Sequence, residues 1–250
     1  MTNVTTERFD IGRVIGRTFG VIGRNLAVFA ALAVLLNGLP AALLGLARAG
    51  LLPSTGPVEW SLSWSWLLNM LISAWLQAAI IRGAIGDLNG QKPTFAECMG
   101  AAAGDIFPLV GVSITATVAV VLGLFFFVIP GVFLALLLSV SAPVRVVERT
   151  GVFAALGRSG DLTRSHRGAI LGLYALYGVG YVVGAIVLDQ LAAPLTLMGA
   201  AGALLREGLV TPLAGAATSL IAAAGVAAIY FELRTVKEGI GIEALASVFD

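Results

Sequence analysis

Few side chains in this sequence have the types and spacing that chemistry requires. The densest group lies between Pro143 and Gly168, where Glu148, Asp161 and His166 are close in sequence. A carboxylate beside a histidine could act as a general acid and base. The same stretch carries the arginines Arg145, Arg149, Arg158, Arg164 and Arg167. Ion pairing with them explains the carboxylates better. No nucleophile, base and orienting group are visible together, so we expect no catalytic residue and no enzymatic activity.

Composition limits metal and disulfide chemistry. The chain has one cysteine, Cys98, and one histidine, His166. An internal disulfide needs two cysteines, and zinc-type sites draw on several Cys and His ligands. We therefore expect no metal ion and no cofactor. Cys98 shares a helical face with Phe95, Met99 and Ala102, which indicates a buried packing residue rather than a reactive thiol.

Two amide side chains, Asn37 and Gln77, lie inside long apolar runs. Gly38 and Pro40 also interrupt the run around Asn37, and proline removes a helical hydrogen bond. One interpretation is a broken helix that lines a site, as in transporters. The other is a packed kink, which we prefer because no ionisable residue is present there. Asn37 and Gln77 are the candidate polar residues within the membrane.

Seven arginines are candidates for binding anionic lipid headgroups. They are Arg13, Arg17, Arg24, Arg149, Arg158, Arg164 and Arg167. Between Phe9 and Arg24 the arginines fall opposite an apolar face that includes Ile11 and Val14, a pattern typical of a helix lying on a membrane surface. Each basic side chain near an anionic membrane contributes about 1 kcal/mol to binding. The alternative is that these arginines only set the topology.

Helices in a membrane must position these residues. Hydrophobic residues make up 58% of the chain and charged residues 12%, whereas soluble domains are about 25% charged. We therefore predict an integral membrane protein with no nucleic-acid partner. Because one span takes about 20 apolar residues, the 250 residues fit about six spans. The predicted fold class is all-α, as a single polytopic membrane domain over residues 1–250.

The apolar runs divide the chain into spans and surface segments. The expected spans are 26–47, 64–81, 107–129, 131–147, 168–188 and 210–231. Interfacial amphipathic helices are expected at 9–24, 94–104 and 151–166, and a cytoplasmic tail at 232–250. The charge-free run from Phe107 to Val144 would measure roughly 57 Å as one helix, against a hydrocarbon thickness of about 30 Å. It must double back, and we expect Pro130 and Gly131 to supply the turn.

Local signals refine these segments. Thr94, followed three residues later by Glu97, predicts a capping box at a helix start. Trp60, Trp64 and Trp66 are expected to form an aromatic belt at the membrane surface.

The fifth span holds two pairs of glycines four residues apart, which predict close contact with another helix. They are Gly168 with Gly172 and Gly180 with Gly184. Asp189 is expected to end this span. The segment 189–209 is apolar but broken by proline and glycine, and either a re-entrant turn or a surface helix fits it.

The order surface helix, span, span occurs three times, starting near Phe9, Phe95 and Phe153. The residues that follow Arg145 also align without gaps on those that follow Arg234. This suggests an internal repeat of three hairpins, each preceded by an amphipathic helix on the cytoplasmic face. The alternative is that any six-span protein with basic inner loops looks periodic.

The basic residues also predict the orientation. All Lys and Arg except Arg48 and Arg206 fall in segments assigned to one side of the membrane. By the positive-inside rule this side is the cytoplasm. We therefore expect both the N-terminus and the C-terminus to be cytoplasmic.

Two stretches, 129–173 and 230–240, resemble the bacterial membrane-domain family that occurs alone or fused to glycerophosphoryl diester phosphodiesterases. The matching features are Pro130-Gly131, Ala142-Pro143, Glu148, Ala155-Leu156, Arg158-Ser159 and the basic entry into the next span. The resemblance implies a multi-pass protein of the bacterial cytoplasmic (inner) membrane. The phosphodiesterase activity of that family belongs to a soluble barrel that these residues do not contain, so no catalytic residue carries over.

Two functions are considered. The first is a non-enzymatic membrane protein that organises envelope lipids or partner proteins through its basic cytoplasmic-face helices. The second is a transporter or channel-like protein for an apolar or lipid-like substrate, with Asn37 and Gln77 on its path. The expected partners are membrane lipids with anionic headgroups, together with a second copy of the chain or another membrane protein.

Overall fold

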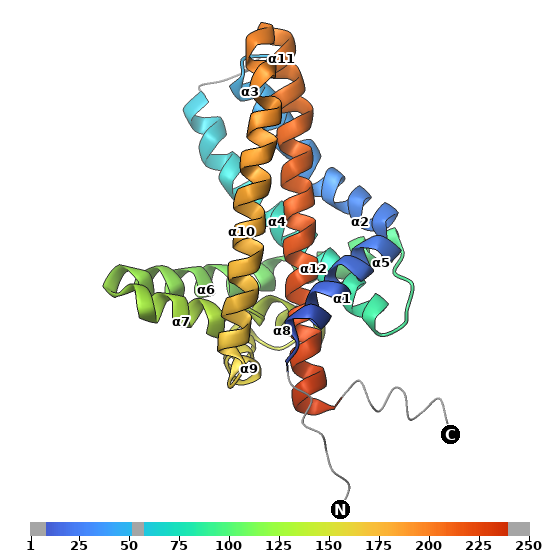
Figure 1. The fold of residues 1–250 in the computed structure, drawn as a ribbon, viewed down its shortest axis with the longest axis vertical. Helices are drawn as coiled ribbons and strands as arrows, with labels where there is room; N and C mark the ends of the chain where they lie inside the picture. The colour runs from blue at the N-terminus through green and yellow to red at the C-terminus, as the bar shows by residue number, and fades with distance from the viewer. Residues whose placement is uncertain (1–8, 52–57, 240–250) are drawn as a thin grey trace, which may run out of the picture.

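The computed structural model describes residues 9–51 and 58–239, and these are helical almost throughout (Figure 1). The helices are α1 (Ile11–Arg24), α2 (Leu26–Ala33), η1 (Val34–Gly38), α3 (Leu39–Arg48), α4 (Val58–Leu88), α5 (Phe95–Ala103), α6 (Ile106–Phe126), α7 (Val128–Leu137), α8 (Ser141–Glu148), α9 (Val152–Thr163), α10 (Arg167–Ala192), η2 (Ala193–Met198), α11 (Gly199–Leu205), η3 (Arg206–Val210) and α12 (Thr211–Glu238). The described residues include no β-strand. The all-α prediction is confirmed.

Several helical segments have the length and composition of membrane spans. Within the described ranges they are Leu26–Arg48, Leu67–Leu88, Ile106–Phe126, Val128–Glu148 and Arg167–Glu238. The last segment contains both α10 and α12, which lie side by side with α11 at their shared end (Figure 1). These apolar helices support the prediction of a membrane protein.

The ends of the surface helices follow local sequence. Asp10 caps α1, because its carboxylate accepts a hydrogen bond from the Arg13 backbone N–H at 3.1 Å. The predicted capping box at α5 is confirmed: the Glu97 N–H donates to the Thr94 hydroxyl at 3.3 Å, and the Thr94 N–H donates to the Glu97 carboxylate at 3.0 Å. One backbone donor at the start of α1 and two at the start of α5 are thus satisfied locally.

The first apolar segment bends without breaking. Between α2 and α3 the backbone forms a π-helical turn, η1, and Pro40, which lacks an N–H, follows this turn as the second residue of α3. Gly38 lies close to α12, since a Cβ there would be 3.7 Å from both the Ala216 Cβ and the Pro212 carbonyl oxygen. The packed-kink interpretation fits this arrangement.

The core surrounds the second half of α12. Ala223, Ala224 and Ala227 to Tyr230 are buried, and α1, α2, α4, α8 and α9 all contact this helix. Small side chains allow these neighbours to approach closely. α12 continues to Glu238, beyond the predicted end of the sixth span at residue 231, so part of the predicted cytoplasmic tail is helical. The rest of that tail, from residue 240, lies outside the described residues.

The charge-free run doubles back as predicted, but its turn lies earlier than expected. Phe127 is extended (φ −158°, ψ 143°) between α6 and α7. Pro130 and Gly131 are in the first turns of α7, so the prediction that they form the turn was wrong. Proline is tolerated in a first helical turn because the N–H it lacks would have no helical partner there.

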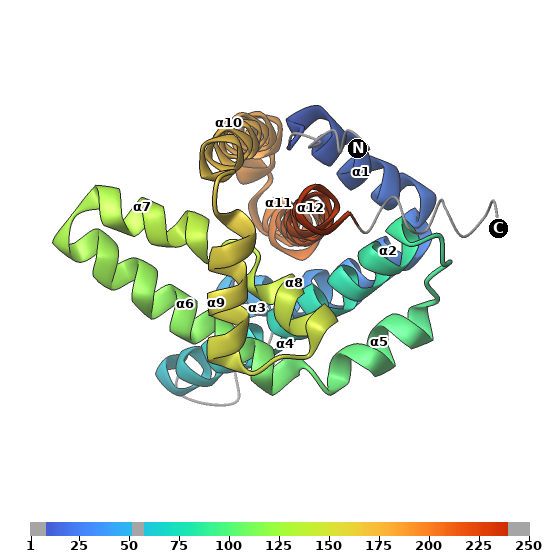
Figure 2. The same cartoon turned by 90° about the horizontal axis from the view of Figure 1, so that it is seen from below.

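The segment predicted as the fourth span, 131–147, is not one continuous helix. α7 ends at Leu137, and α8 starts at Ser141 after a turn. Seen from two directions, the α6–α7 hairpin runs across α10 and α12: α6 and α7 extend sideways in both views, while α10 and α12 are upright in Figure 1 and end-on in Figure 2. Because 107–129 and 131–147 were predicted to be spans, the hairpin was expected to run parallel to α10 and α12.

α10 continues past Asp189 to Ala192, so the predicted end at Asp189 was three residues early. The segment 189–209 is neither of the two alternatives but a helical reversal built from η2, α11 and η3. At this end the Arg206 guanidinium pairs with the Asp189 carboxylate at 2.7 Å. The reversal therefore connects α10 to α12 directly.

The glycine pairs do not mark the close contacts that were expected. A Cβ added at Gly168, Gly180 or Gly184 would meet nothing within 4 Å, and at Gly172 it would meet only Ile11, at 3.7 Å. Among the described residues, no helix packs closely on these glycines.

The predicted repeat is not supported. The second helix of one unit, α7, has 10 residues, whereas that of the last unit, α12, has 28. The hairpins also point in different directions (Figure 1). The predicted tryptophan belt falls on α4, but the side chains of Trp60, Trp64 and Trp66 lie outside the described part of the structure.

Candidate functional site

The two amides singled out in the sequence line the same cavity. Its volume is about 300 Å³, and it lies between the η1 turn, α4, α6 and α12. The lining residues are Asn37, Met70, Ser73, Ala74, Leu76, Gln77, Ser113, Ser219, Ala222 and Ala223. Asn37 and Gln77 are far apart in sequence, so the fold brings together the polar groups of separate apolar helices.

The π-helical turn η1 contributes Asn37. Its Nδ2 donates a hydrogen bond to the Ser219 Oγ of α12 at 2.6 Å. Side-chain hydrogen bonds between membrane helices contribute about 0.6 kcal/mol on average. Single π-helical turns are frequent at functional sites, because the extra residue changes which side chains face a neighbour. The bond both joins two helices and places an amide on the cavity wall.

α4 and α6 supply the other polar groups. Ser73 and Gln77 are one helical turn apart on α4, so they share a face. Ser113 comes from α6. Ser73 is exposed, whereas Gln77, Ser113 and Ser219 are half-buried. The cavity is thus enclosed by four segments and borders the protein surface at Ser73.

The cavity chemistry is neutral. None of the lining residues is ionisable, and the amides and hydroxyls offer hydrogen-bond donors and acceptors beside apolar walls from Met70, Leu76 and three alanines. Neutral donors and acceptors match hydroxyl, ester or amide groups, whereas an ion would meet no opposite charge. The set contains serines but no His, Asp, Glu or Lys that could activate them.

The arginines predicted to contact lipid lie elsewhere, at one end of the molecule. The side chain of Glu232 on α12 is 0% exposed, and it pairs with both Arg13, at 2.7 Å, and Arg17. The Asp10 backbone N–H also donates to this carboxylate at 3.2 Å. The arginine face of α1 thus turns toward α12, not away from the protein as the lipid-binding prediction assumed.

The Arg24 side chain is 58% exposed but is also paired with a carboxylate of the chain. Its guanidinium donates to Asp87 of α4 at 3.1 Å, and the Asn25 amide donates to the same carboxylate at 2.7 Å. The hydrogen bond that Arg24 donates to the Asp87 carboxylate raises the pKa of Arg24. Asp105 accepts from Arg82 at 3.1 Å and lies 3.4 Å from Arg145. Carboxylates near the helix ends therefore tie α1 to α4, and α4 to α8.

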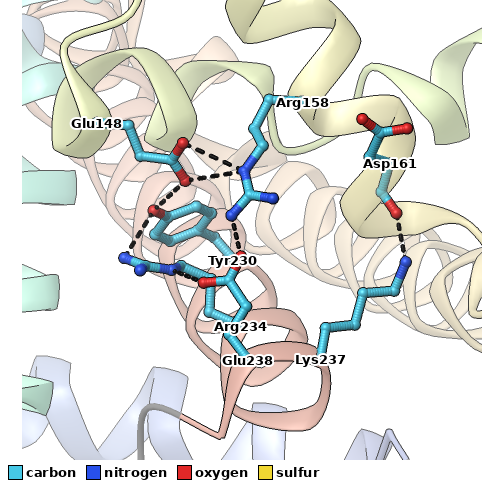
Figure 3. A network of polar contacts seen from close by, with 7 residues as sticks. All are labelled: Glu148, Arg158, Asp161, Tyr230, Arg234, Lys237 and Glu238. Carbon is cyan, nitrogen blue, oxygen red and sulfur yellow. Dashed lines mark hydrogen bonds and ion pairs between the residues drawn. The ribbon is translucent and has the colours of Figure 1, made fainter.

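Arg158 belongs to a network that joins α8, α9 and α12 (Figure 3). Its Nε donates to Glu148 at 3.2 Å, and its terminal nitrogen pairs with Glu238. Glu148 also accepts from the Tyr230 hydroxyl at 3.0 Å. Arg234 donates to Glu238 at 2.8 Å. Nearby, the Lys237 ammonium donates to the Asp161 backbone carbonyl.

The three remaining candidate arginines differ in exposure. Arg149 and Arg164 are exposed, and Arg149 ends α8 in the left-handed conformation (φ 51°). The Arg167 guanidinium lies over the Phe133 ring, 4.4 Å from its centroid, and donates to the Gly160 carbonyl at 3.4 Å. Arg149 and Arg164 thus face away from the protein, whereas Arg167 fastens α7 and α9 to the start of α10.

The acid–base group considered from the sequence does not assemble. Glu148 is bound by Arg158 and Tyr230, Asp161 is exposed, and the His166 ring packs against Phe9 with centroids 6.0 Å apart. Ion pairing accounts for Glu148, as expected. Within the described residues, no three His, Cys, Asp or Glu side chains are grouped to hold a metal ion.

Sequence reasoning missed Glu232 and the serines. Glu232 was assigned to the cytoplasmic tail, although Arg13 and Arg17, one helical turn apart, require an acidic partner if their face is covered. Ser73 could have been found from its spacing to Gln77, whereas Ser113 and Ser219 carry no sequence signal beyond lying in apolar runs.

Comparison with known proteins gave no family model, no curated protein and no solved structure that matches this chain.

Proposed function

We propose that this chain is a non-enzymatic integral membrane protein that binds an uncharged, lipid-like molecule in the cavity beside Asn37 and Gln77 and moves it across the membrane. The observation that carries the proposal is the convergence of Asn37, Gln77, Ser73, Ser113 and Ser219 on one cavity of about 300 Å³. Polar groups in apolar helices are costly unless they bond to a partner, so their grouping indicates a polar ligand or path.

The cavity's size and opening favour a lipid-like molecule. A volume of about 300 Å³ is at the lower end of ligand sites and suits a small polar headgroup. Ser73 is exposed on the outer side of α4, where acyl chains could remain in the bilayer while the headgroup bonds to the amides. The neutral lining favours hydroxylated or amide headgroups over phosphates.

The orientation is part of the proposal. The arginine-bearing end, formed by α1, α8, α9 and the last turns of α12, faces the cytoplasm under the positive-inside rule. The resemblance to the phosphodiesterase-associated membrane domains supports a place in a bacterial cytoplasmic membrane. Six crossings, the number predicted from the sequence, would require both α6 and α7 to cross.

A flip assay tests the proposal. Vesicles containing the protein would carry a fluorescent monoglycosyl diacylglycerol, an uncharged lipid with a hydroxylated headgroup. Dithionite added outside bleaches only lipid that reaches the outer leaflet. With the protein present, we expect dithionite to bleach the labelled lipid of both leaflets, because exchange brings inner-leaflet lipid to the outer leaflet. Asn37→Leu or Gln77→Leu should slow this exchange at least severalfold. A fluorescent phosphatidylglycerol should exchange much less.

Gln190→Leu is the matched control, because it also replaces a polar side chain with leucine but lies exposed on α10. Its exchange rate should equal that of the unaltered protein. Exchange no faster than in empty vesicles, or undiminished exchange in both cavity variants, would contradict the proposal.

A second function rests on the exposure of Arg149 and Arg164 at the arginine-bearing end. We propose that these two residues, rather than Arg13, Arg17, Arg24 or Arg158, bind anionic headgroups or a partner protein. Photocrosslinking to phosphatidylglycerol should fall when both are changed to Glu. An unchanged yield would leave them a role in topology only.

A further inference from the structure

The α6–α7 hairpin carries no charged side chain and ends in a large exposed apolar tip. From Phe107 to Val144 no residue is charged. At the tip, five consecutive large side chains are 69% to 82% exposed. They are Phe125, Phe126, Phe127, Val128 and Ile129. A turn that reached water would carry polar side chains, so this tip is built for hydrocarbon.

α7 is too short to cross a bilayer. Its 10 residues measure about 15 Å as a helix, and the hydrocarbon core is about 30 Å thick. The chain turns after Leu137, and α8 is fastened separately through Arg145 to Asp105. α8 therefore does not lengthen α7 into a span. α6, with 21 residues, measures about 31 Å and is long enough to reach across the hydrocarbon by itself, so the direction of the hairpin decides where its tip lies.

Contacts place the base of the hairpin at the arginine-bearing end. Phe133 of α7 lies under the guanidinium of Arg167, the first residue of α10. A Cβ on Gly160 of α9 would lie 3.2 Å from Leu137, and one on Gly111 of α6 would lie 3.3 Å from Val152. Both hairpin helices are thus held by α9, and α7 is also held by the start of α10.

The direction of the hairpin also argues against a crossing of the bilayer. Both views show α6 and α7 pointing away from the bundle and across α10 and α12 (Figures 1 and 2). If α10 and α12 follow the membrane normal, the hairpin follows the membrane plane. Its level, set by Arg167, is within the leaflet on the arginine-bearing side.

The hairpin is also a preformed unit. A Cβ on Gly131 would lie 2.6 Å from the Leu124 backbone nitrogen, and one on Gly123 would lie 2.9 Å from the Gly131 Cα. These glycines let the two helices touch along their backbones. Close packing at the tip makes the hairpin a rigid wedge rather than a loose loop.

We propose that the α6–α7 hairpin is a membrane wedge that lies among the acyl chains of the arginine-side leaflet and does not cross the bilayer. The chain then crosses with Leu26–Arg48, α4, α10 and α12, which keeps both described ends on the same side. The occupant of the apolar surface is lipid hydrocarbon, because an interfacial helix would need a polar face and this hairpin has none at its outer half. By adding volume to one leaflet, the wedge would favour curved or locally thinned membrane.

Cysteine accessibility in reconstituted full-length protein tests this placement. With Cys98 replaced by Ser, single cysteines are introduced as Phe126→Cys and, in case that variant fails to fold, Val128→Cys. Ala154→Cys on α9 and Leu197→Cys at the reversal are controls for the two sides, because both positions are exposed. A membrane-impermeant maleimide is added outside or trapped inside the vesicles.

We expect Ala154→Cys and Leu197→Cys to be labelled from opposite sides and the tip cysteines from neither. A fluorophore attached to the tip in detergent before reconstitution should be quenched by nitroxide on acyl chains more strongly than by nitroxide on headgroups. Tip labelling from the Leu197 side would mean that the hairpin crosses the bilayer. Tip labelling from the Ala154 side without acyl-chain quenching would mean that it projects into water. Either outcome overturns the proposal.

Discussion

α12 and the α6–α7 hairpin are both apolar and helical, but they are held in opposite ways. The second half of α12 is covered, and its last turns carry Glu232 and Glu238 in ion pairs with α1 and α9. The tip of the hairpin, from Phe125 to Ile129, is exposed, and the close contacts of Gly123 and Gly131 beside it are made within the hairpin. In water the exposed hairpin would be a liability, whereas in a bilayer it is fully solvated by hydrocarbon.

The difference shows what holds a small membrane domain together. Lipid removes the hydrophobic drive for helices to associate, so packing of small residues and polar bonds must do it. α12 has both, in its alanines and in Glu232. The hairpin has its closest glycine packing between its own two helices and looser glycine contacts to α9 at its base. α12 should therefore be sensitive to loss of charge partners, and the hairpin only to loss of its own packing.

The largest effect is expected from removing both partners of Glu232. The double variant Arg13→Ala, Arg17→Ala leaves a fully buried carboxylate with only the Asp10 N–H. Loss of a buried charge partner costs about 3–5 kcal/mol. Unfolding by added SDS in detergent micelles measures the change. Arg164→Ala, which removes an exposed guanidinium, is the control and should be close to neutral. A double variant as stable as that control would place Glu232 in a solvated site.

Gly131→Val should act on the hairpin alone. The new side chain would collide with the Leu124 backbone, and overpacking costs about 1–3 kcal/mol. We expect the spin-label distance between positions 122 and 132 to increase, while SDS unfolding of the bundle changes little. Gly180→Val, in open space on α10, is the control. If Gly131→Val destabilised the bundle as much as the loss of the partners of Glu232, the hairpin would not be a separately packed unit.

Tyr230→Phe should weaken the end of α12 by about 1 kcal/mol, the net contribution of a typical hydrogen bond. The change removes the hydroxyl that donates to Glu148 at 3.0 Å and accepts from Arg234 at 3.3 Å. The same SDS titration measures it. Tyr181→Phe, on the exposed part of α10, should be neutral. A neutral Tyr230→Phe would mean that Arg158 satisfies Glu148 without the tyrosine.

The smallest effect concerns reactivity rather than stability. Burial raises the pKa of the Cys98 thiol to about 11, with a smaller contribution from Glu97. The thiol therefore stays protonated near neutral pH, where the thiolate is the reactive form. Maleimide should label Cys98 far more slowly than a cysteine at Ala154, and its rate should rise as the pH approaches 11. Equal rates near neutral pH would show that α5 opens readily.

Hydropathy, residue spacing and capping signals predicted much of the fold. They located the surface helices near Phe9, Thr94 and Phe153 and the reversal of the charge-free run. These signals did not predict where α6 and α7 end. Near the turn at Phe127, Gly131 packs on Leu124, and at the break after Leu137 the Ser159 hydroxyl donates to the Leu137 carbonyl. Hydropathy does not report such contacts.

The site was predictable in part. Asn37 and Gln77 were identified because amides are rare in apolar runs, and the cavity brings them together. What the basic face of α1 contacts was not predictable, because an amphipathic helix has the same sequence pattern whether that face meets lipid headgroups or a buried carboxylate. Only the position of Glu232, set by the continuation of α12, decides between them.

The π-helical turn at η1 lets one chain segment face two partners at once. Phe29 of α2 packs against Gly83, while Gly38 lies against α12. Residues in an α-helix advance by about 100° each, so deleting one residue, such as Leu35, would rotate α2 relative to α3 by that amount. Either Phe29 would leave its seat or Asn37 would swing away from Ser219. The presence or absence of a single codon at this position thus decides whether the polar wall of the cavity forms.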